Sequence, residues 1–416
     1  MNVSHTRKIA FEILLRVETQ MGFSDELLHS DRTNNLEERD QALVFELVLG
    51  CLRRQGELDY RIAQLSSRSL AQLDVEVRIA LRLGCYQLYF LDRVPAHAAV
   101  SESVELVRLA RKRSATGLVN AVLRRIAEDV EKLNFSGENH PRWLVKKWKD
   151  HFGEKTASAL MGANLETAKT YLRLNTRFST VETIELLRQE GIETNPTEIP
   201  HCLLVVSGKA TRSRCYEQGR VHIQDISSQM VVPHLGLRPG MSFLDVCAAP
   251  GGKANQALEL LLNKEGNLEA PAIACDLHLH RFRRMKEVTK RQFHCVTTDA
   301  LHPLPFNRLF DRILVDAPCS GTGTLVRNPE IKWRLTSDDL SHLQSRQQRI
   351  LSNALTLLVP GGVLVYSTCS IEPEENHQVI HNVLNKSNLL AIDCLERLPG
   401  RDAGDGFFVC KISQVE

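Results

Sequence analysis

Three absences narrow the class of protein. The sequence has no apolar stretch of the roughly 20 residues that a membrane-spanning helix needs, and its first residues, MNVSHTRKIAFEILLRVE, lack the apolar core of a signal peptide. None of the 11 cysteines forms a C-x-x-C pair, and the histidines lack the spacing of metal ligands. We therefore expect a soluble, cytoplasmic protein with no bound metal, in which most cysteines are reduced.

A strong excess of charge is also missing. The formal net charge is only +2, with 52 Lys and Arg against 50 Asp and Glu. An even balance does not exclude a nucleic-acid partner, because a polyanion needs a local basic face rather than a basic average. With 43% hydrophobic and 25% charged residues, the composition is that of a globular protein, and 416 residues leave room for two or three domains.

The first part of the chain predicts an all-α domain over residues 1–135. Apolar residues recur at helical spacing, as in Ile9, Ile13 and Val17, whereas strand-like alternation is missing. Pro95 stands where a proline can begin a helix. The polar stretch 134–141, NFSGENHP, is broken by glycine and proline and predicts a domain boundary.

The pattern changes beyond that boundary. Three short strands at 171–175, 203–207 and 221–224, with a helix at 181–189, predict a small α+β domain over residues 142–235. From 236 to 416, apolar strands alternate with helices. Strands are expected at 242–246, 272–275, 295–298, 312–315 and 362–366. This alternation predicts an α/β domain around a parallel sheet, with its ligands beyond the carboxyl ends of the strands.

A turn rich in small residues follows the first strand of that sheet. The segment DVCAAPGGK, residues 245–253, matches neither a P-loop nor a dinucleotide fingerprint. Acidic residues follow at later strand ends, namely Asp276, Asp299 and Asp316. Such an array suits an adenosyl ligand without phosphates, since carboxylates accept hydrogen bonds from ribose hydroxyls and an adenine amino group. The alternative is that Asp276 and Asp299 only cap helices.

Two cysteines directly follow strands of the same sheet. Cys319 lies in DAPCSG and Cys369 in STCS, so both should open onto one crevice. Carbon 5 of cytosine is a poor nucleophile until a thiolate adds at carbon 6, and a second thiol can assist release of the adduct. Asp316, protonated or sharing a proton, is hypothesised to hydrogen-bond ring nitrogen 3. The spacing does not decide which thiol attacks.

Three motifs, DVCAAPGGK, VDAPCSGTG and LVYSTCSIEPEEN, resemble those of the Nop2/Sun family of RNA 5-methylcytosine methyltransferases. The resemblance extends to RNPEIKW at 327–333 and GDGFF at 404–408, and implies a Rossmann-like class I methyltransferase domain. It implies that Cys369 is the nucleophile and that Cys319 assists release. The residues it implies for S-adenosylmethionine are Cys247, Ala248, Ala249, Pro250, Gly251, Gly252, Lys253, Asp276, Asp299 and Asp316.

The N-terminal segments ELVLGCLRR, PAHAAVSESVELVR and GLVNAVLRRI resemble the NusB-type helical RNA-binding fold, and the middle stretch resembles a ferredoxin-like or RRM-like domain. Together these resemblances imply methylation of a cytosine in 16S ribosomal RNA, free or in an early-assembled small subunit. They imply no membrane and no protein partner. Candidate phosphate contacts are Arg53, Arg54, Arg111, Lys112, Arg113, Arg124 and Arg125, and less strongly the basic run from Arg281 to Arg291.

Three alternatives stay open. The substrate could be another RNA, such as a tRNA. A DNA cytosine-5 methyltransferase also carries a P-C motif, but there that motif supplies the nucleophile, and the additional T-C motif with the NusB-like segment favours RNA. A non-catalytic RNA-binding assembly factor would retain the fold, although the intact cysteines and acidic series argue against it.

Overall fold

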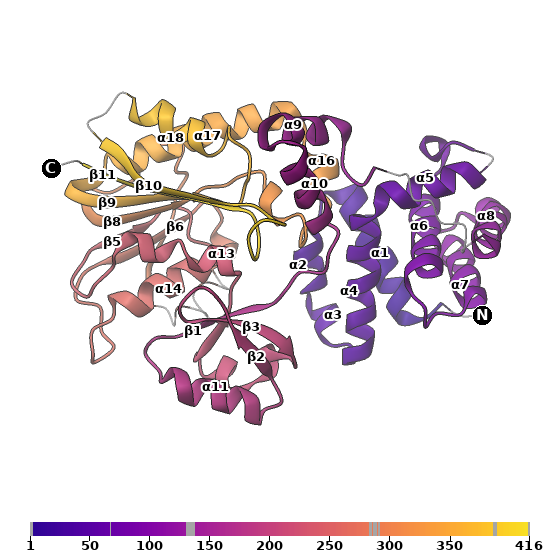
Figure 1. Cartoon of the computed structure of the whole chain (residues 1–416), viewed down its shortest axis with the longest axis horizontal. Coiled ribbons are helices and arrows are strands. Elements are labelled where there is room, and N and C mark those ends of the chain that lie inside the picture. Colours follow the sequence, from indigo (N-terminus) through magenta and orange to yellow (C-terminus); the bar gives the residue numbers. More distant parts are fainter. Residues whose placement is uncertain are drawn as a thin grey trace. The chain divides into compact units, whose positions relative to one another are not determined.

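A computed structural model describes residues 3–66, 68–129, 138–282, 285, 289, 292–385 and 389–414. The chain divides into two compact units (Figure 1). Unit 1 comprises Met1–Glu166 and Leu325–Arg334, and unit 2 comprises Thr167–Thr324 and Leu335–Glu416. Among the described residues, no helix combines the length and the apolar character needed to cross a membrane.

Unit 1 is helical throughout its described residues. The helices are α1 (His5–Gln20), α2 (Ser24–Leu28), α3 (Asp31–Asn34), α4 (Glu38–Arg53), α5 (Gln55–Leu65), α6 (Val75–Phe90), α7 (Ala96–Leu109), α8 (Thr116–Glu128), α9 (Arg142–Phe152), α10 (Glu154–Ala163) and α16 (Ile331–Arg334). Short 3-10 turns lie at Leu70–Gln72 and Arg113–Ala115. Pro95 is the residue before α7, as its position in the sequence predicted.

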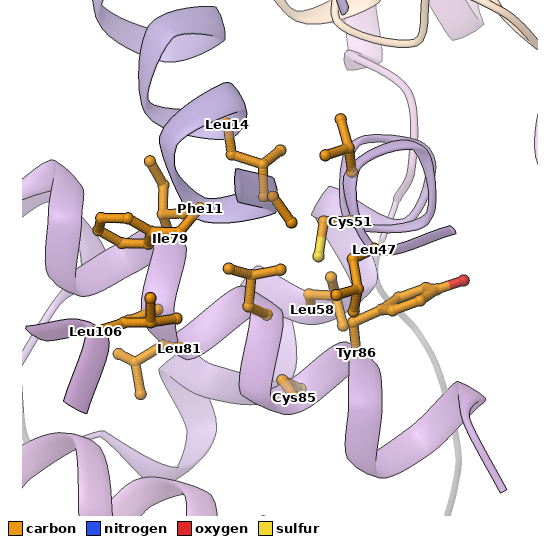
Figure 2. Packing of buried hydrophobic residues seen from close by; sticks show 14 of the residues in the cluster. Phe11, Leu14, Leu47, Cys51, Leu58, Ile79, Leu81, Cys85, Tyr86 and Leu106 are labelled. Atoms are coloured by element: carbon orange, nitrogen blue, oxygen red, sulfur yellow. The ribbon is translucent and has the colours of Figure 1, made fainter. Parts of the chain in front are cut away.

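The core of unit 1 is formed by the apolar stripes of these helices (Figure 2). Leu47 of α4 and Leu81 of α6 are fully buried there, at the helical spacing that the sequence shows. Helices α4 and α6 meet at Gly50, where an added Cβ would lie 2.0 Å from the ring of Tyr86. A glycine is therefore required at this crossing, despite its cost in helix propensity.

A ten-residue segment from the C-terminal half completes unit 1. This segment, Leu325–Arg334, contains α16 and is tied to the N-terminal helices by buried charged groups. Ser24 donates to Glu330 from its backbone N–H at 2.8 Å and from its hydroxyl at 2.7 Å. Lys332, which is fully buried, donates to the Arg53 carbonyl at 2.8 Å, and Arg53 in turn donates to the Val326 carbonyl. The charged side chains of Glu330 and Lys332 therefore anchor the segment and do not face solvent.

The first sheet of unit 2 has four antiparallel strands in the order β2-β3-β1-β4. They are β1 (Tyr171–Leu174), β2 (Glu193–Pro196), β3 (Cys202–Ser207) and β4 (Val221–Ile223), joined by α11 (Thr180–Gln189) and α12 (Arg214–Glu217). Ser179 caps α11 by accepting from the Glu182 N–H. Leu172, Leu187 and Val221 pack in its core. The small α+β fold expected for the middle of the chain is confirmed.

The second sheet has seven strands in the order β10-β11-β9-β8-β5-β6-β7. The strands are β5 (Phe243–Asp245), β6 (Ala272–Asp276), β7 (His294–Thr297), β8 (Phe310–Asp316), β9 (Leu358–Thr368), β10 (Leu389–Arg397) and β11 (Phe407–Gln414). Neighbours from β9 to β7 run parallel, whereas β11 and β10 are antiparallel to their neighbours. The parallel part is confirmed. The sequence did not indicate the antiparallel pair.

Helices cover both faces of this sheet (Figure 1). They are α13 (Ile226–Gln229), α14 (Gly252–Leu261), α17 (Ser337–Leu355) and α18 (His377–Leu384), with a 3-10 turn at Val232–Leu235. Alternate strand residues face opposite cores: Phe243 packs with α14, whereas Leu244 packs with α17 and α18. Thr336 and Asp339 form a capping box that begins α17. A sheet buried on both faces requires nearly continuous apolar strands, as the sequence has.

A buried polar cluster joins the two sheets within unit 2. Arg173 of β1 forms an ion pair with Glu259 of α14, and its side chain is 5% exposed. Arg173 also donates to Gln224 at 2.8 Å, and the His222 ring lies 3.1 Å from Glu259. Because each charge has a partner, burial of this cluster is tolerated. The small sheet is thereby fixed to the helix that follows the glycine-rich turn.

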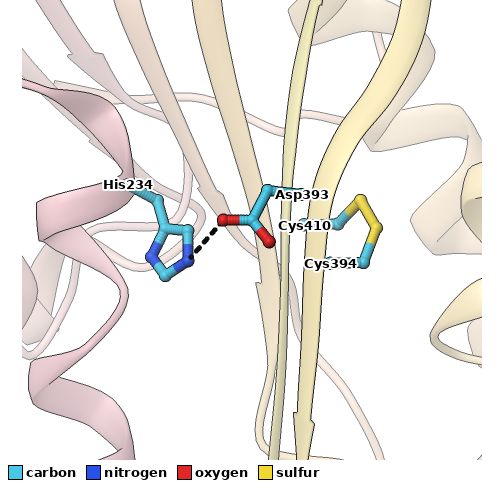
Figure 3. Close-up of a disulfide and its surroundings, with 4 residues drawn as sticks. All are labelled: His234, Asp393, Cys394 and Cys410. Carbon is cyan, nitrogen blue, oxygen red and sulfur yellow. Dashed lines mark ion pairs between the residues drawn. A yellow bond between two sulfur atoms is a disulfide. The ribbon is translucent and has the colours of Figure 1, made fainter.

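One disulfide links the two antiparallel strands. Cys394 of β10 and Cys410 of β11 are directly opposite in the strand register and form the bond, and His234 lies 3.6 Å from the neighbouring Asp393 (Figure 3). The other nine cysteines are free, which agrees with the expectation that most are reduced. The pairing itself was not predicted, because sequence separation does not reveal strand register.

The domain limits 1–135, 142–235 and 236–416 stay predictions. Residues 134–137 of the proposed boundary at 134–141 lie outside the described residues. Helices α9 and α10, after that boundary, belong to compact unit 1. Helix α14 ends at Leu261, and Leu262 and Leu268 form an isolated bridge in the polar stretch that follows.

Candidate active site

Two thiols meet at the carboxyl ends of neighbouring parallel strands. Cys319 follows β8 by three residues and Cys369 follows β9 directly, and their Sγ atoms lie 3.2 Å apart. Both are free and partly exposed. The hydrogen bond with Cys369, together with burial, raises the pKa of the Cys319 thiol well above its ordinary value. This distance confirms that the two thiols lie together at one edge of the sheet, and their opening onto a crevice stays a prediction.

Asp316, the last residue of β8, is held between two side chains. Lys253 donates to its Oδ2 at 2.7 Å, and the Ser367 hydroxyl donates to its Oδ1 at 2.8 Å. The Lys253 ammonium also lies 5.1 Å from the Phe407 ring centre. Burial disfavours the charge on Lys253, but Asp316 outweighs it and holds the pKa of the ammonium above its ordinary value. The sequence placed Lys253 only near a cofactor and did not predict this ion pair.

The small-residue turn connects β5 to α14. Gly251 has φ of 106°, which favours glycine, and the Ala249–Pro250 peptide bond is cis. An added Cβ at Gly252 would meet no atom within 4 Å, so the backbone there borders open space at the start of α14. Burial raises the pKa of the Cys247 thiol well above its ordinary value. Cys247 is therefore suited to a backbone role rather than to thiol chemistry.

The carboxylates of Asp245, Asp276 and Asp316 lie close to one another near this turn. Burial, reinforced by the charge of Asp316, raises the pKa of Asp245 to about 8. Asp276 accepts from the Ala249 N–H at 3.3 Å and from the His278 N–H at 2.9 Å. Such crowding of negative charge is expected to favour a cation nearby. In the sequence, Asp245 is only the first residue of the motif. Its raised pKa depends on burial and on Asp316, and the motif shows neither.

The alternative that Asp276 and Asp299 only cap helices is not supported within the described residues. Each carboxylate accepts from a backbone N–H of the loop after its strand, and the 3-10 turn Leu279–Arg281 has no side-chain cap. Asp276 is 4% exposed and stabilises the backbone of both the turn and its own loop. Asp299 follows β7 and accepts from the Leu301 N–H at 3.0 Å, but its side chain is 39% exposed. Their roles toward a ligand therefore stay predictions.

The two cysteine loops are locked together by backbone contacts. Gly323 donates to the Cys369 carbonyl at 3.0 Å, and its own carbonyl accepts from Gly406 at 2.7 Å. An added Cβ at Gly323 would lie 2.2 Å from the Gly406 carbonyl oxygen. This close approach explains why glycines stand in both TGT and GDGFF. The sequence alone gives these glycines no physical role, because the contact joins two segments far apart in the chain.

The basic residues expected to contact RNA have different environments. Arg53 is 5% exposed and donates to a backbone carbonyl, so its prediction as a phosphate contact is wrong. Arg111, Arg113, Arg124 and Arg125 are exposed, whereas Lys112 pairs with Asp74. Arg281 lies 3.4 Å from Asp276. The other members of that run, Arg283, Arg284, Lys286, Lys290 and Arg291, lie outside the described residues.

Family models match the chain in three consecutive stretches. Residues 4–128 match the NusB family, 140–211 match the RsmF/B-like ferredoxin-like domain, and 232–413 match the 16S rRNA methyltransferase RsmB/F. With a Rossmann-like sheet and strand-end thiols, these stretches define an rRNA methyltransferase built from a NusB-like, a ferredoxin-like and a methyltransferase domain.

Relatives along the whole chain specify the family. A probable ribosomal RNA small subunit methyltransferase B of Bacillus subtilis (strain 168) is 32% identical over 99% of both chains. The ribosomal RNA small subunit methyltransferase B of Pasteurella multocida (strain Pm70) is 34% identical over 99% of this chain and 96% of its own. The chain belongs to the RsmB/F family of rRNA methyltransferases.

Solved structures share the fold. A methyltransferase homolog from Pyrococcus horikoshii aligns with 66% of this chain and 96% of its own, with a TM-score of 0.59 and 26% identity. NSun6 from Pyrococcus horikoshii with SFG aligns over 66% of this chain and 98% of its own, with a TM-score of 0.60 and 20% identity. At these identities the two structures support the α/β fold.

Proposed function

We propose that this protein transfers a methyl group from S-adenosylmethionine to carbon 5 of a cytosine in 16S ribosomal RNA. The observation that carries the proposal is the pair of thiols, 3.2 Å apart, beside the Asp316–Lys253 ion pair. One reactive thiol suffices for many reactions. Two at one strand edge suit a reaction in which the enzyme must both add to a ring and be expelled from it.

In this proposal Cys369 forms the covalent bond. Its thiolate adds to carbon 6 of cytosine, and the ring electron pair moves toward carbon 5. Lys253 lies close enough to Cys369 for the charges of the two groups to interact. Cys319 is surrounded differently, with Cys369 and Glu375 both disfavouring its thiolate. This asymmetry supports Cys369 as the attacking group and Cys319 as a thiol.

The Asp316–Lys253 pair would hold the ring during that addition. Negative charge develops on the ring when the thiolate adds, and a shared proton between a carboxylate and an ammonium can be donated toward ring nitrogen 3 or its neighbouring oxygen. Ser367 fixes the Asp316 carboxylate from its other side. After methylation the carbon-5 proton must leave and the bond from Cys369 to carbon 6 must break, a step in which Cys319 is proposed to assist.

The turn and its carboxylates fit S-adenosylmethionine, which supplies the methyl group as a sulfonium cation. Residues Cys247–Lys253 border open space at Gly252, and Asp245, Asp276 and Asp316 concentrate negative charge there. A cationic ligand counters the repulsion from Asp316 that, after burial, raises the pKa of Asp245. The NSun6 structure, which contains SFG, supports a ligand on this fold. S-adenosylmethionine should therefore stabilise the protein more than S-adenosylhomocysteine, which lacks the sulfonium charge, in a thermal unfolding experiment.

Methylation of protein-free 16S rRNA, of early-assembled small subunits and of tRNA with labelled S-adenosylmethionine tests the substrate, with 5-methylcytosine mapped by bisulfite sequencing. Cys369→Ala should abolish transfer. Cys319→Ala should accumulate a covalent protein–RNA adduct, seen as a slow-migrating band. Cys275→Ala, a buried cysteine inside β6, is the control and should retain activity. Full activity in Cys369→Ala, or a methyl group elsewhere than carbon 5, would sink the mechanism.

A further inference from the structure

We infer that Glu375 is a positioning residue that bridges the two cysteine loops and keeps Cys319 as the thiol while Cys369 carries the thiolate. The inference rests on the proposed cytosine chemistry for its consequence, but its structural basis is independent of it. Glu375 lies in the loop between β9 and α18 and is fully buried. Nothing in the reaction requires it to touch the substrate.

Both cysteine loops donate hydrogen bonds to this one carboxylate. From the Cys319 loop, the Ser320 backbone N–H donates to Oε1 at 2.8 Å and the Ser320 hydroxyl donates to Oε2. From the Cys369 loop, the Ser370 hydroxyl donates to Oε2. Ser320 and Ser370 are each the residue after a reactive cysteine. Glu375 therefore connects the two positions that set where the thiols point.

A third element completes the bridge. Gln347 of α17 donates at 2.9 Å both to Glu375 and to the Pro318 carbonyl, the residue before Cys319. Oxygen atoms of an ionised carboxylate accept several hydrogen bonds, and Glu375 receives four. In the described part of the chain, no Lys, Arg or His forms an ion pair with Glu375. Its negative charge is therefore not neutralised by a cation and acts on the neighbouring groups.

The two thiols have different charged neighbours. The groups that face Cys319 are Cys369, Glu375 and Tyr366, together with the Gly321 N–H. Of these, Glu375 raises the pKa of Cys319, after the hydrogen bond with Cys369 and burial, and Tyr366 is itself neutral because burial raises its pKa. Near Cys369 lies the Lys253 ammonium, which is itself paired with Asp316. A thiol at Cys319 can donate its S–H to the Cys369 sulfur, 3.2 Å away, and stabilise a thiolate there.

Removal of the Glu375 charge should change the reactivity of the Cys319 thiol, whereas loss of a purely structural contact should not. Glu375→Gln keeps the size of the side chain but removes the negative charge. We expect Cys319 to react with limiting iodoacetamide about threefold faster or more at pH 8, since alkylation follows the thiolate fraction. Cys319 and Cys369 lie on different tryptic peptides, because Arg327, Lys332 and Arg334 separate them, so mass spectrometry reports each thiol in the intact pair. The pH dependence of Cys319 alkylation should move to lower pH.

Glu375→Asp tests the length of the side chain separately from its charge. It keeps the carboxylate but shortens the side chain by one methylene, so the bridge to Ser320 and Ser370 should loosen. We expect kcat for methylation to fall by about tenfold or more with KM little changed, while the pH dependence of Cys319 alkylation stays near that of wild type. Ser320→Ala, which removes one bridging hydroxyl and keeps the charge, should resemble Glu375→Asp in both measurements.

Glu372→Gln is the matched control, because it removes another fully buried carboxylate of the same loop. The inference is overturned if Glu375→Gln leaves the Cys319 alkylation profile unchanged, or if Glu372→Gln shifts it equally. Should Glu375→Gln fail to fold, wild-type kcat in the Ser320→Ala, Ser370→Ala double variant would overturn the bridge. Absence of 5-methylcytosine with the wild-type protein would instead defeat the proposed function, and the alkylation profiles would still report on Glu375.

Discussion

The core of unit 1 and the segment 367–376 at the candidate active site, here called the catalytic edge, both bury most of their side chains, but the buried side chains differ in chemistry. In unit 1, helices α1, α4 and α6 pack through apolar side chains such as Ile9, Leu47 and Leu81. At the catalytic edge, the segment 367–376 buries mostly polar side chains. These are Ser367, Thr368, Ser370, Glu372, Glu375 and Asn376.

The difference shows how stability and function are distributed. Burial of apolar surface stabilises in proportion to area and tolerates small shifts. A buried polar group stabilises only when its hydrogen bonds are made, so the edge is sensitive to geometry. At this edge, the Thr368 hydroxyl donates to the side-chain oxygen of Asn376, and the Tyr366 hydroxyl donates to the Glu375 carbonyl at 2.7 Å. Substitutions in unit 1 should therefore change folding, and substitutions at the edge should change rate.

The three tryptophans allow the two regions to be measured separately. Trp143, Trp148 and Trp333 are the only tryptophans of the chain, and all lie in unit 1. Trp148 is fully buried. Tryptophan fluorescence during urea unfolding therefore reports on the helical unit, whereas methylation reports on the catalytic edge.

The largest expected effect is on the helical core. Leu47→Ala removes a fully buried side chain and leaves a cavity, which should lower the free energy of unfolding of unit 1 by about 2–5 kcal/mol. Tryptophan fluorescence in urea measures this loss. At a temperature where the variant is folded, kcat should remain within about twofold of wild type. A large fall in kcat without a loss of stability would contradict the division between the regions.

The reverse effect, a loss of activity without a loss of stability in unit 1, is expected for a substitution at Gly323. In Gly323→Ala the new Cβ lies 2.2 Å from the Gly406 carbonyl oxygen and 2.8 Å from that of Cys369, so the cysteine loop must move. A displacement of this kind should lower kcat by about 100-fold or more, with the tryptophan unfolding midpoint unchanged. Gly162→Ala in α10 is the control, because its Cβ meets nothing within 4 Å and both measurements should stay near wild type. Equal activity in the two variants would show that the loop contact is unimportant.

Lys332 gives unit 1 a dependence on pH. Burial lowers its pKa in the folded protein to about 7 from 10.5, so between these values the unfolded chain holds a proton that the folded chain has released. Stability should therefore rise with pH across this window, by at most about 1.4 kcal/mol per pH unit, and be unaffected by this group below it.

Urea unfolding followed by tryptophan fluorescence from pH 7 to 9.5 measures that slope. Lys332→Met should remove its contribution, whereas Lys155→Met, at an exposed position of α10, should keep it. The same slope in both variants would mean that Lys332 remains charged when folded.

The smallest effect concerns the disulfide. The Cys394–Cys410 bond closes a loop with a sequence separation of 16, for which chain entropy predicts about 3 kcal/mol. Backbone pairing of β10 with β11 already closes that loop, so Cys394→Ser should cost less and leave kcat unchanged. Thermal unfolding with and without dithiothreitol checks this. A fall in kcat on reduction would connect the strand pair to the catalytic edge and weaken the comparison.

The sequence by itself determined the type of those elements that have a local apolar pattern. Apolar periodicity predicted the helical character of residues 1–135 and the parallel strands β5 to β9, because burial on one helix stripe or on both sheet faces leaves such a pattern. The strand-end positions of Cys319, Cys369 and Asp316 followed from the same pattern. Only the resemblance to a family, and not the spacing, distinguished one thiol from the other.

The tertiary structure decided what depends on contacts between distant residues. The ion pair of Lys253 with Asp316, the bridge through Glu375 and the transfer of Leu325–Arg334 into the helical unit join residues far apart in the chain. The burial of Arg53 is of the same kind, because a basic residue at a helix end gives no local sign of which surface will cover it. Charge depends on the packed environment, and that environment is absent from any short stretch of sequence.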